Sequence, residues 1–280
     1  FDNFIRLATR NEELESALVF SRRDAREVDT FASSDLTDGR DREGNTFYGN
    51  IKYLLNDTSS LSFIAEDFNR DTRTETKPAN LDTSLGTQSF IEDILIDRTR
   101  FSLTYEYDDP DSPSFIQYAR AQIFSQESTE IERNLENRIS RGALVFRDTE
   151  NKFIADSYGG DVQLQSDFAT GNLEHRLTYG LDVSTTFNSR PRDRNQTDLA
   201  TGITTNVIPP DIFPVKDFPD GDTLRLGLYL QDEIEMGPFD LIAGLRFDHY
   251  DLDTSPDLDF ARNGAESSNL NESALSPRIA

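Results

Sequence analysis

The chain of 280 residues has no cysteine, no tryptophan and a single methionine. The absence of cysteine excludes disulfides, zinc–thiolate sites and a cysteine nucleophile within this sequence. There is no run of about 18 apolar residues, so no transmembrane helix is predicted. Basic residues are few, 28 Lys and Arg against 52 Asp and Glu, which gives a formal charge of -24. This acidic balance argues against nucleic-acid binding, because that function requires stripes of basic side chains.

The apolar and aromatic contents narrow the class of protein further. The apolar fraction of 35% is low for a large soluble core, whereas the aromatic fraction of 10% is high for a disordered acidic chain. Strands of a membrane barrel turn half of their residues to a polar lumen, so their overall hydropathy resembles that of a soluble protein. The composition is therefore compatible with a membrane location.

The stretch 223–253 carries the clearest structural signal. Apolar and polar side chains alternate along two runs, which the pair Gly237 and Pro238 separates. The apolar positions are Leu224, Leu226, Leu228, Leu230, Ile234 and Met236 in the first run, and Phe239, Leu241, Ala243, Leu245 and Phe247 in the second. A period of two puts these side chains on one face of a strand, so the stretch predicts a β-hairpin. Each run is long enough, at roughly 9–11 residues, to cross a bilayer as a tilted strand.

Weaker alternation elsewhere predicts about eleven strands in all. The expected strands are 4–10, 15–29, 47–55, 61–76, 99–107, 115–127, 158–168, 173–183, 223–236, 239–253 and one that begins at 274. Short turns are expected at 11–14, 56–60, 108–113, 169–172 and 237–238, and long loops at 31–45, 77–91, 128–154, 189–222 and 254–273. Strict alternation of short and long connections is typical of an outer-membrane barrel, whose short side is periplasmic.

The predicted fold is all-β: a segment of a transmembrane antiparallel β-barrel with long extracellular loops and short periplasmic turns. Lipid supplies no hydrogen bonds, so every strand of such a barrel needs two neighbours and the sheet must close. We expect residues 1–280 to form an open curved sheet that missing parts of a longer protein complete. The alternative is a soluble β-sandwich binding module, in which the apolar faces pack on each other.

Three segments near the end of the chain resemble TonB-dependent outer-membrane receptors. They are 229–233 (YLQDE), 243–248 (AGLRFD) and 275–278 (LSPR). Two further segments, 216–220 (KDFPD) and 158–161 (YGGD), are most similar to the haem and haemoglobin branch of that family. The first three segments lie within residues 223–280, and the rest of the chain agrees with the family in hairpin pattern.

The resemblance implies a barrel of about 22 strands in the bacterial outer membrane, plugged by an N-terminal globular domain. It implies a receptor that takes up an iron compound, with haem or haemoglobin as the expected ligand and the TonB complex as partner. A ferric siderophore is the alternative ligand for the same class of barrel. We expect residues 1–280 to be an internal piece, without the plug domain and the C-terminal strands, that has no enzymatic activity and no cofactor of its own.

Arginines in the longest expected loop are the candidate ligand contacts. Arg190, Arg192 and Arg194 offer positive charge to an anionic group such as a haem propionate or a siderophore carboxylate. The alternatives are contact with anionic lipids of the membrane surface and pairing with the acidic excess of the chain.

Four polar side chains of the hairpin occupy the alternate strand positions that face the lumen. They are Gln231, Glu233, Arg246 and Asp248. We regard them as candidate contacts to the plug, although ladder pairs between neighbouring strands are the simpler interpretation. Asp232 has the opposite parity and faces lipid, which is costly unless it lies near the periplasmic margin.

The remaining motifs argue against metal and enzyme chemistry. The histidines, His175 and His249, fall on the apolar side of their strands, whereas a haem ligand should face the lumen or lie in a loop. Haem-ligating histidines are therefore expected outside this sequence. The acidic clusters 35–41 and 251–259 lack the spacing of an EF-hand, so no metal site is predicted. There is no nucleophile elbow, triad context or glycine-rich phosphate loop.

Overall fold

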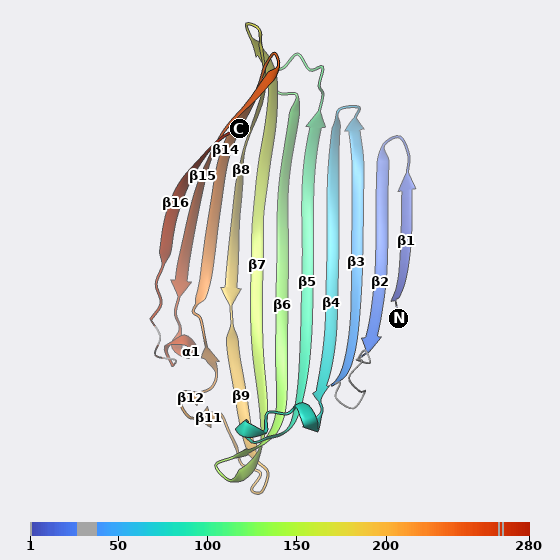
Figure 1. Cartoon of the computed structure of the whole chain (residues 1–280). Helices are drawn as coiled ribbons and strands as arrows, with labels where there is room; N and C mark the ends of the chain where they lie inside the picture. The colour runs from blue at the N-terminus through green and yellow to red at the C-terminus, as the bar shows by residue number, and fades with distance from the viewer. Residues whose placement is uncertain (1, 27–37, 263, 265) are drawn as a thin grey trace.

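The computed structural model describes residues 2–26, 38–262, 264 and 266–280. Eleven long antiparallel strands lie side by side in chain order, β1 to β8 and then β14 to β16 (Figure 1). They are β1 (Asp2–Arg10), β2 (Leu14–Arg26), β3 (Gly39–Asn56), β4 (Ser59–Thr76), β5 (Thr87–Asp108), β6 (Tyr118–Ser140), β7 (Ala143–Thr170), β8 (Leu173–Ser189), β14 (Asp220–Met236), β15 (Phe239–Ser255) and β16 (Leu270–Ile279). The predicted all-β fold and the approximate number of strands are confirmed.

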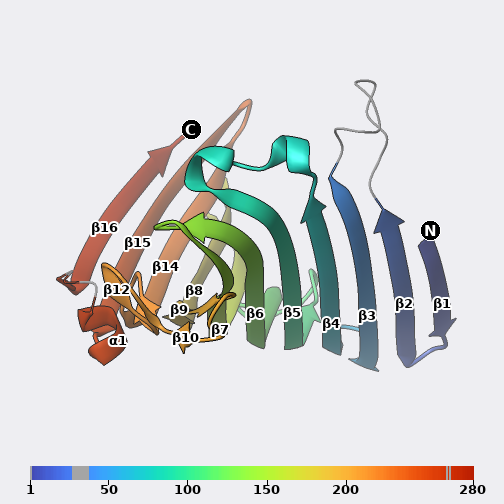
Figure 2. The same ribbon diagram turned by 90° about the horizontal axis from the view of Figure 1, so that it is seen from below.

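The sheet is curved and open. Among the described residues β1 pairs only with β2 and β16 only with β15. Figure 2 shows these two strands at the free edges of the curved row, with the concave side between them. An open segment of a larger closed sheet was the expected arrangement.

The strands are much longer than a bilayer requires. β7 has 28 residues, and at about 3.3 Å per residue it is roughly 90 Å long. The apolar residues of β4, such as Leu61 and Phe63, follow its short turn, and polar residues continue the strand to Thr76. We call the two ends of the sheet the short-turn end and the long-loop end. The extra length lies toward the long-loop end.

Several stretches that were expected to be long loops are strand. The prediction for 128–154 is wrong, because β6 and β7 pair from Tyr118 to Ser140 and turn at Arg141 and Gly142. Both turn residues have positive φ, 52° and 83°, as a tight hairpin turn requires. β3 already begins at Gly39, β5 at Thr87 and β16 at Leu270, so those loops are also shorter than expected. The first part of the loop expected at 31–45 lies outside the described residues.

The register keeps one apolar and one polar face aligned across the sheet. Leu228 of β14 lies opposite Leu181 of β8 and Phe247 of β15. Within the described part of the chain, the buried hydrophobic side chains are only Val145, Phe213, Val215 and Phe260, all at the long-loop end. The one other sheet has two strands of two residues, β11 (Val207–Ile208) and β12 (Asp211–Ile212). Nothing in the described residues covers the apolar face, so the β-sandwich interpretation is wrong.

The connection between β8 and β14 folds over the long-loop end. Its strand β9 (Pro191–Asp198) pairs with β7, and β9 also pairs with β10 (Thr204–Thr205) and β13 (Val215–Lys216). The single helical turn α1 (Leu258–Ala261) contacts β13. In the described residues no helix is long and apolar enough to span a membrane.

Candidate functional site

The polar face of the sheet is its concave face. On β5, Phe101 and Leu103 are 48% and 38% exposed, whereas Ser102 between them is only 6% exposed. The same contrast recurs along β3 and β4, where polar-face side chains are the less exposed ones. Curvature crowds side chains on the inner side and separates them on the outer side. The concave face therefore collects the charged groups available for binding.

The four predicted lumenal residues lie together on the polar face of β14 and β15. Gln231 Nε2 donates to Glu233 Oε1 at 3.0 Å, and Arg246 Nε donates to Asp248 Oδ1 at 2.8 Å. These are contacts between neighbours on one strand. They are not ladder pairs between neighbouring strands, and contact with a plug remains a prediction.

Arg246 also forms an ion pair across an intervening strand. Its Nη2 lies 3.0 Å from Asp182 Oδ2 on β8, although β14 separates β8 from β15. Gly227 of β14 lies opposite both Asp182 and Asp248. A Cβ at residue 227 would overlap with Arg246 Nη2 and Asp182 Oδ2. The ion pair therefore depends on the missing side chain at Gly227.

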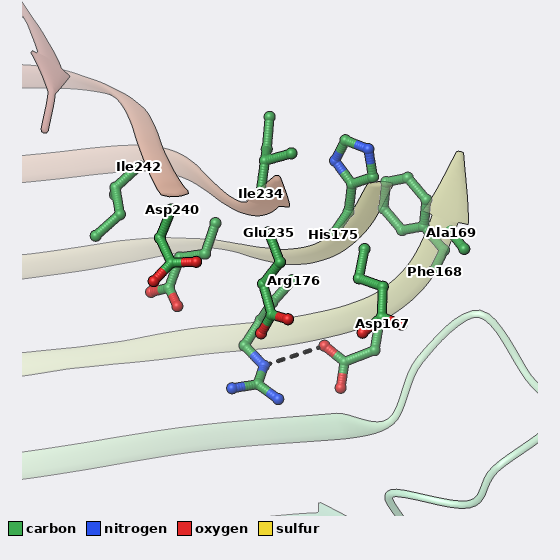
Figure 3. Close-up of a pocket in the computed structure, with 11 residues that line it drawn as sticks. Asp167, Phe168, Ala169, His175, Arg176, Ile234, Glu235, Asp240 and Ile242 are labelled. Atoms are coloured by element: carbon green, nitrogen blue, oxygen red, sulfur yellow. Dashed lines mark hydrogen bonds and ion pairs between the residues drawn. The ribbon is translucent and has the colours of Figure 1, made fainter. Parts of the chain in front are cut away.

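The short-turn end of the concave face is strongly acidic. A hollow of about 430 Å³ lies over β7, β8, β14 and β15. The carboxylates lining it are Asp167, Glu174, Glu233, Glu235 and Asp240. Arg176 lines it too, and its Nε is 3.2 Å from Asp167 Oδ1. Figure 3 shows Asp167 and Arg176 on one side of the strands, with His175 and Phe168 on the other.

His175 and Asp232 meet on the apolar face. His175 Nδ1 is 2.9 Å from Asp232 Oδ2, and its Nε2 is 2.5 Å from Thr170 Oγ1. The imidazole stacks on Phe168 with a centroid distance of 4.9 Å. Asp232 lies four positions before the end of β14 at the short-turn end. His175 thus provides a partner for one oxygen of this carboxylate on the apolar face, whereas Asp232 Oδ1 is buried without a hydrogen bond among the described residues.

The second histidine and the acidic clusters serve local contacts. His249 Nδ1 is 2.9 Å from Ser273 Oγ on the neighbouring strand. Asp251 and Asp253 accept hydrogen bonds from asparagine side chains of the same hairpin. Residues 35–37 of the cluster 35–41 lie outside the described residues, and Asp41 lies in β3. No group of three or more potential ligands within the described ranges is arranged to hold a metal ion.

The three candidate arginines differ in their surroundings. The guanidinium carbons of Arg192 and Arg194 lie 5.8 and 5.1 Å from the ring centroid of the buried Phe213. Arg192 also pairs with Asp217 at 3.3 Å, and Arg194 Nε donates to Thr149 Oγ1 at 2.9 Å. Burial, and then the charge of Arg192, lowers the pKa of Arg194.

Arg190, by contrast, is exposed. It lines a cavity of about 260 Å³ with Glu130 and Glu132. Arg190 thus lines a cavity, whereas Arg192 and Arg194 hold the loop together. Ligand contact by any of the three remains a prediction.

Lys216 anchors the same loop. Its Nζ donates to Asp220 Oδ2 at 2.7 Å and to Asp257 Oδ2 at 2.6 Å, and the residue is 7% exposed. Burial alone would lower the pKa of Lys216, but the two carboxylates outweigh it and raise that pKa. Asp257 also caps α1 by accepting from the backbone N–H groups of Asp259 and Phe260. The Lys216 side chain thus links the connection between β8 and β14 to the connection between β15 and β16.

Sequence reasoning missed a group of arginines on the concave face at the long-loop end. Arg42 of β3 and Arg70 of β4 lie there with Arg23 of β2. The available signal was the alternation in 39–44 (GRDREG), where Arg40 and Arg42 alternate with acidic residues. Because the stretch contains no apolar residue, hydropathy alone predicts a loop there.

Comparison with known proteins identifies the class of fold. Residues 25–280 match the family model described as "TonB dependent receptor-like, beta-barrel". No curated protein matches the sequence. Similar solved structures include BauA, the ferric preacinetobactin receptor of Acinetobacter baumannii, with a TM-score of 0.61 and 14% identity over 100% of this chain and 42% of that one.

Two further structures agree with this fold. The copper transporter OprC has a TM-score of 0.64 and 12% identity, over 99% of this chain and 40% of that one. The siderophore receptor PiuA of Acinetobacter baumannii has a TM-score of 0.57 and 14% identity, over 99% and 43%. The chain thus spans about two fifths of the length of each of these proteins.

Proposed function

Because the chain belongs to the family of TonB-dependent receptor β-barrels and is therefore an outer-membrane protein, we propose that it forms part of the wall of a receptor that imports an iron complex. In this role the apolar convex face contacts lipid and the charged concave face lines the lumen. The short-turn end is periplasmic and the long-loop end extracellular. Import is driven by the TonB complex.

The observation that carries this proposal is the single-layered sheet with one apolar face. Large side chains such as Leu228, Leu230 and Leu245 are 45–48% exposed on it. A soluble protein rarely leaves such a continuous apolar surface uncovered. Contact with lipid hydrocarbon instead of water removes the cost of exposing this apolar face. Within the lipid, the backbone N–H and C=O groups of each strand are hydrogen-bonded to the neighbouring strands.

A ferric siderophore is the ligand that we favour over haem. Haem was expected from the segments at Tyr158 and Lys216. Tyr158 is 48% exposed on the apolar face, and Lys216 is held by Asp220 and Asp257, so neither is available to a lumenal ligand. BauA is a ferric preacinetobactin receptor and PiuA a siderophore receptor, which supports the same choice.

The acidic hollow at the periplasmic end is the proposed seat for a basic surface of the plug. Glu233 lines it, and Gln231, Arg246 and Asp248 continue along the same face. An excess of carboxylates over the single Arg176 favours a positively charged neighbour. This assignment keeps the four residues as plug contacts.

Titration of the full-length protein in detergent tests the proposed function. We expect saturable binding of a ferric siderophore and no saturable Soret shift with haem. A Soret shift that the siderophore does not displace would reverse the choice of ligand. Failure of every iron complex to bind would contradict the receptor function itself.

A further inference from the structure

A pocket on the concave face at the extracellular end is walled by arginines. Gly44 of β3 lies directly opposite Arg23 of β2 and Arg70 of β4, and Arg42 follows two positions away on the same face. A hollow of about 360 Å³ lies beside Gly44, lined by these arginines and by one carboxylate, that of Asp2 on β1. We call this hollow the arginine pocket, defined by Arg23, Arg42, Gly44 and Arg70.

Two of these arginines have no partner among the described residues. Neither Arg42 nor Arg70 forms a salt bridge there, and the Nε atoms of both are buried without a hydrogen bond. Burial, and then the charges of Arg40 and Arg70, lowers the pKa of Arg42. Arg23 differs, because its Nε donates to Asp2 at 2.8 Å. The pocket therefore concentrates positive charge that the described residues leave largely uncompensated.

On the opposite face of the same strands, at the same distance from the membrane, arginines are paired with carboxylates. On the convex face Arg22 pairs with Asp24 and Glu43, at 3.1 and 3.0 Å. Arg73 pairs with Glu75 and Asp93, each at 3.3 Å. Among the described residues, two adjacent arginines without a carboxylate partner indicate a binding role for these side chains.

The rest of the pocket suits a ligand that is partly polar and partly flat. Thr46 and Phe68 line it below Gly44. Arg98 lies over the Phe68 ring at 5.8 Å and is itself held by Glu66. The aromatic ring offers an apolar surface, while the guanidinium groups of Arg42 and Arg70 present paired N–H donors that match carboxylate or phenolate oxygens.

We propose that the arginine pocket binds the anionic oxygens of a negatively charged iron chelate as it enters the lumen. This inference rests on the proposed function and deepens it, because it makes the charge of the complex the basis of selection. The pocket faces the lumen, so anionic lipids of the membrane surface do not reach it. A chelate of carboxylate or catecholate groups fits it, and a neutral complex does not use its charge.

The test compares anionic and neutral iron complexes on matched variants. Equilibrium dialysis of the full-length protein in detergent would use ferric citrate, a ferric tris-catecholate and a neutral ferric trihydroxamate. The variants are R42Q and R70Q, the charge-retaining double variant R42K/R70K, and R73Q as control. Arg73 lies three positions from Arg70 on the same strand but on the convex face. Thermal unfolding of each variant is measured in parallel.

We expect the wild type to prefer an anionic complex over the neutral one. R42Q or R70Q should weaken anionic binding by roughly ten- to a hundredfold, the range for hydrogen bonds to charged groups. R42K/R70K should retain part of the affinity, and R73Q should retain all of it. Neutral complexes should bind all variants equally, and anionic binding should weaken as salt is raised.

Three results would overturn the inference. One is equal affinity of the wild type for anionic and neutral complexes, and another is unchanged anionic binding in R42Q and R70Q. The third is a loss of thermal stability in these variants with all complexes affected alike, which would assign the arginines to an internal acidic partner. If no iron complex binds the wild type, the proposed function fails, a result distinct from these three.

Discussion

The two faces of β3 and β4 differ in charge where the strands extend beyond the lipid. Asp41, Glu43 and Asp71 lie on the convex face, and Arg42 and Arg70 alternate with them on the concave face. Neighbours in sequence thus point to opposite sides, so one short segment builds an acidic outer surface and a basic inner one. Within the membrane the same alternation separates apolar from polar side chains. The period of two places alternate residues on opposite faces of the sheet, and the surroundings of each face determine which residue types occur there.

A charge on the lipid-facing side of β14 should produce the largest effect. Leu228→Arg places a guanidinium on the apolar face in the middle of the strand, at a cost of roughly 2–4 kcal/mol near the midplane of a bilayer. Gln231→Arg on the lumenal face of the same strand is the control, and it should change stability little. Urea titration of folding in phospholipid vesicles measures both. Equal effects would remove the distinction between the faces.

Two glycines of the concave face distinguish a crowded position from an open one. Gly227→Ala should displace the ion pair between Arg246 and Asp182 and cost about 1–2 kcal/mol, a typical cost of overpacking. At Gly44 the nearest atom to an added Cβ is the Asn69 carbonyl oxygen at 3.4 Å, so Gly44→Ala should stay within about 0.5 kcal/mol. The same urea titration reports both values. The opposite order would contradict the packing described here.

Lys216 has two carboxylate partners, whereas Arg42 and Arg70 have none among the described residues. Asp257→Ala removes one of its two carboxylates and uncaps α1, at a cost of about 1 kcal/mol because Asp257 is partly exposed. Faster proteolysis of the 190–220 connection than in wild type would show this opening, with Asp259→Ala as a control on the same turn. Equal digestion of wild type and D257A would contradict the anchoring role.

The same carboxylate gives a pH dependence with a defined sign. The hydrogen bond from Lys216 holds the pKa of Asp257 below its usual value. The contribution of the Asp257 carboxylate to stability is therefore complete above its pKa in the unfolded chain, about 3.9. That contribution is lost as the pH falls through the lower pKa of the folded protein. Pepsin digestion from pH 5 to pH 2 should separate wild type from D257A at the upper end and not at the lower end. A constant difference would exclude Asp257 as the titrating group.

The smallest effects should have opposite signs on the two faces. Without ligand, Arg42→Gln relieves repulsion and should stabilise the protein by up to about 0.5 kcal/mol, whereas Arg73→Gln loses surface ion pairs and should destabilise it by a similar amount. Thermal unfolding at low ionic strength, where charges are least screened, measures the difference. Destabilisation of both variants would show that Arg42 is paired in the folded protein.

Much of the membrane-level architecture was predictable from the sequence. The alternation in 223–253 gave the hairpin β14–β15, its turn and the orientation of Gln231 and Arg246, because side chains that meet lipid must be apolar. The extracellular extensions were not predictable in the same way. The stretches 39–46 and 128–154 are mostly polar on both faces, so hydropathy carries no clear period there, and the alternation of charge is the remaining signal.

The candidate site was predictable only in part. Sequence reasoning placed Arg192 and Arg194 in a loop but not against Phe213, since that contact depends on the fold of the whole connection. The cost of Asp232 on the apolar face had no explanation until His175 was found beside it on β8. Both contacts join segments far apart in the chain, and a single sequence does not specify such pairs.

The separation of the two faces is tested most directly by spin labels along β14. Because these 280 residues contain no cysteine, single cysteines at positions 225–231 add no ambiguity within them. In vesicles, positions 226, 228 and 230 should be relaxed by oxygen dissolved in lipid, and positions 225, 229 and 231 by a water-soluble nickel chelate. A strict alternation with period two is the expected result. Equal access of the chelate to both sets would contradict a barrel wall between lipid and lumen.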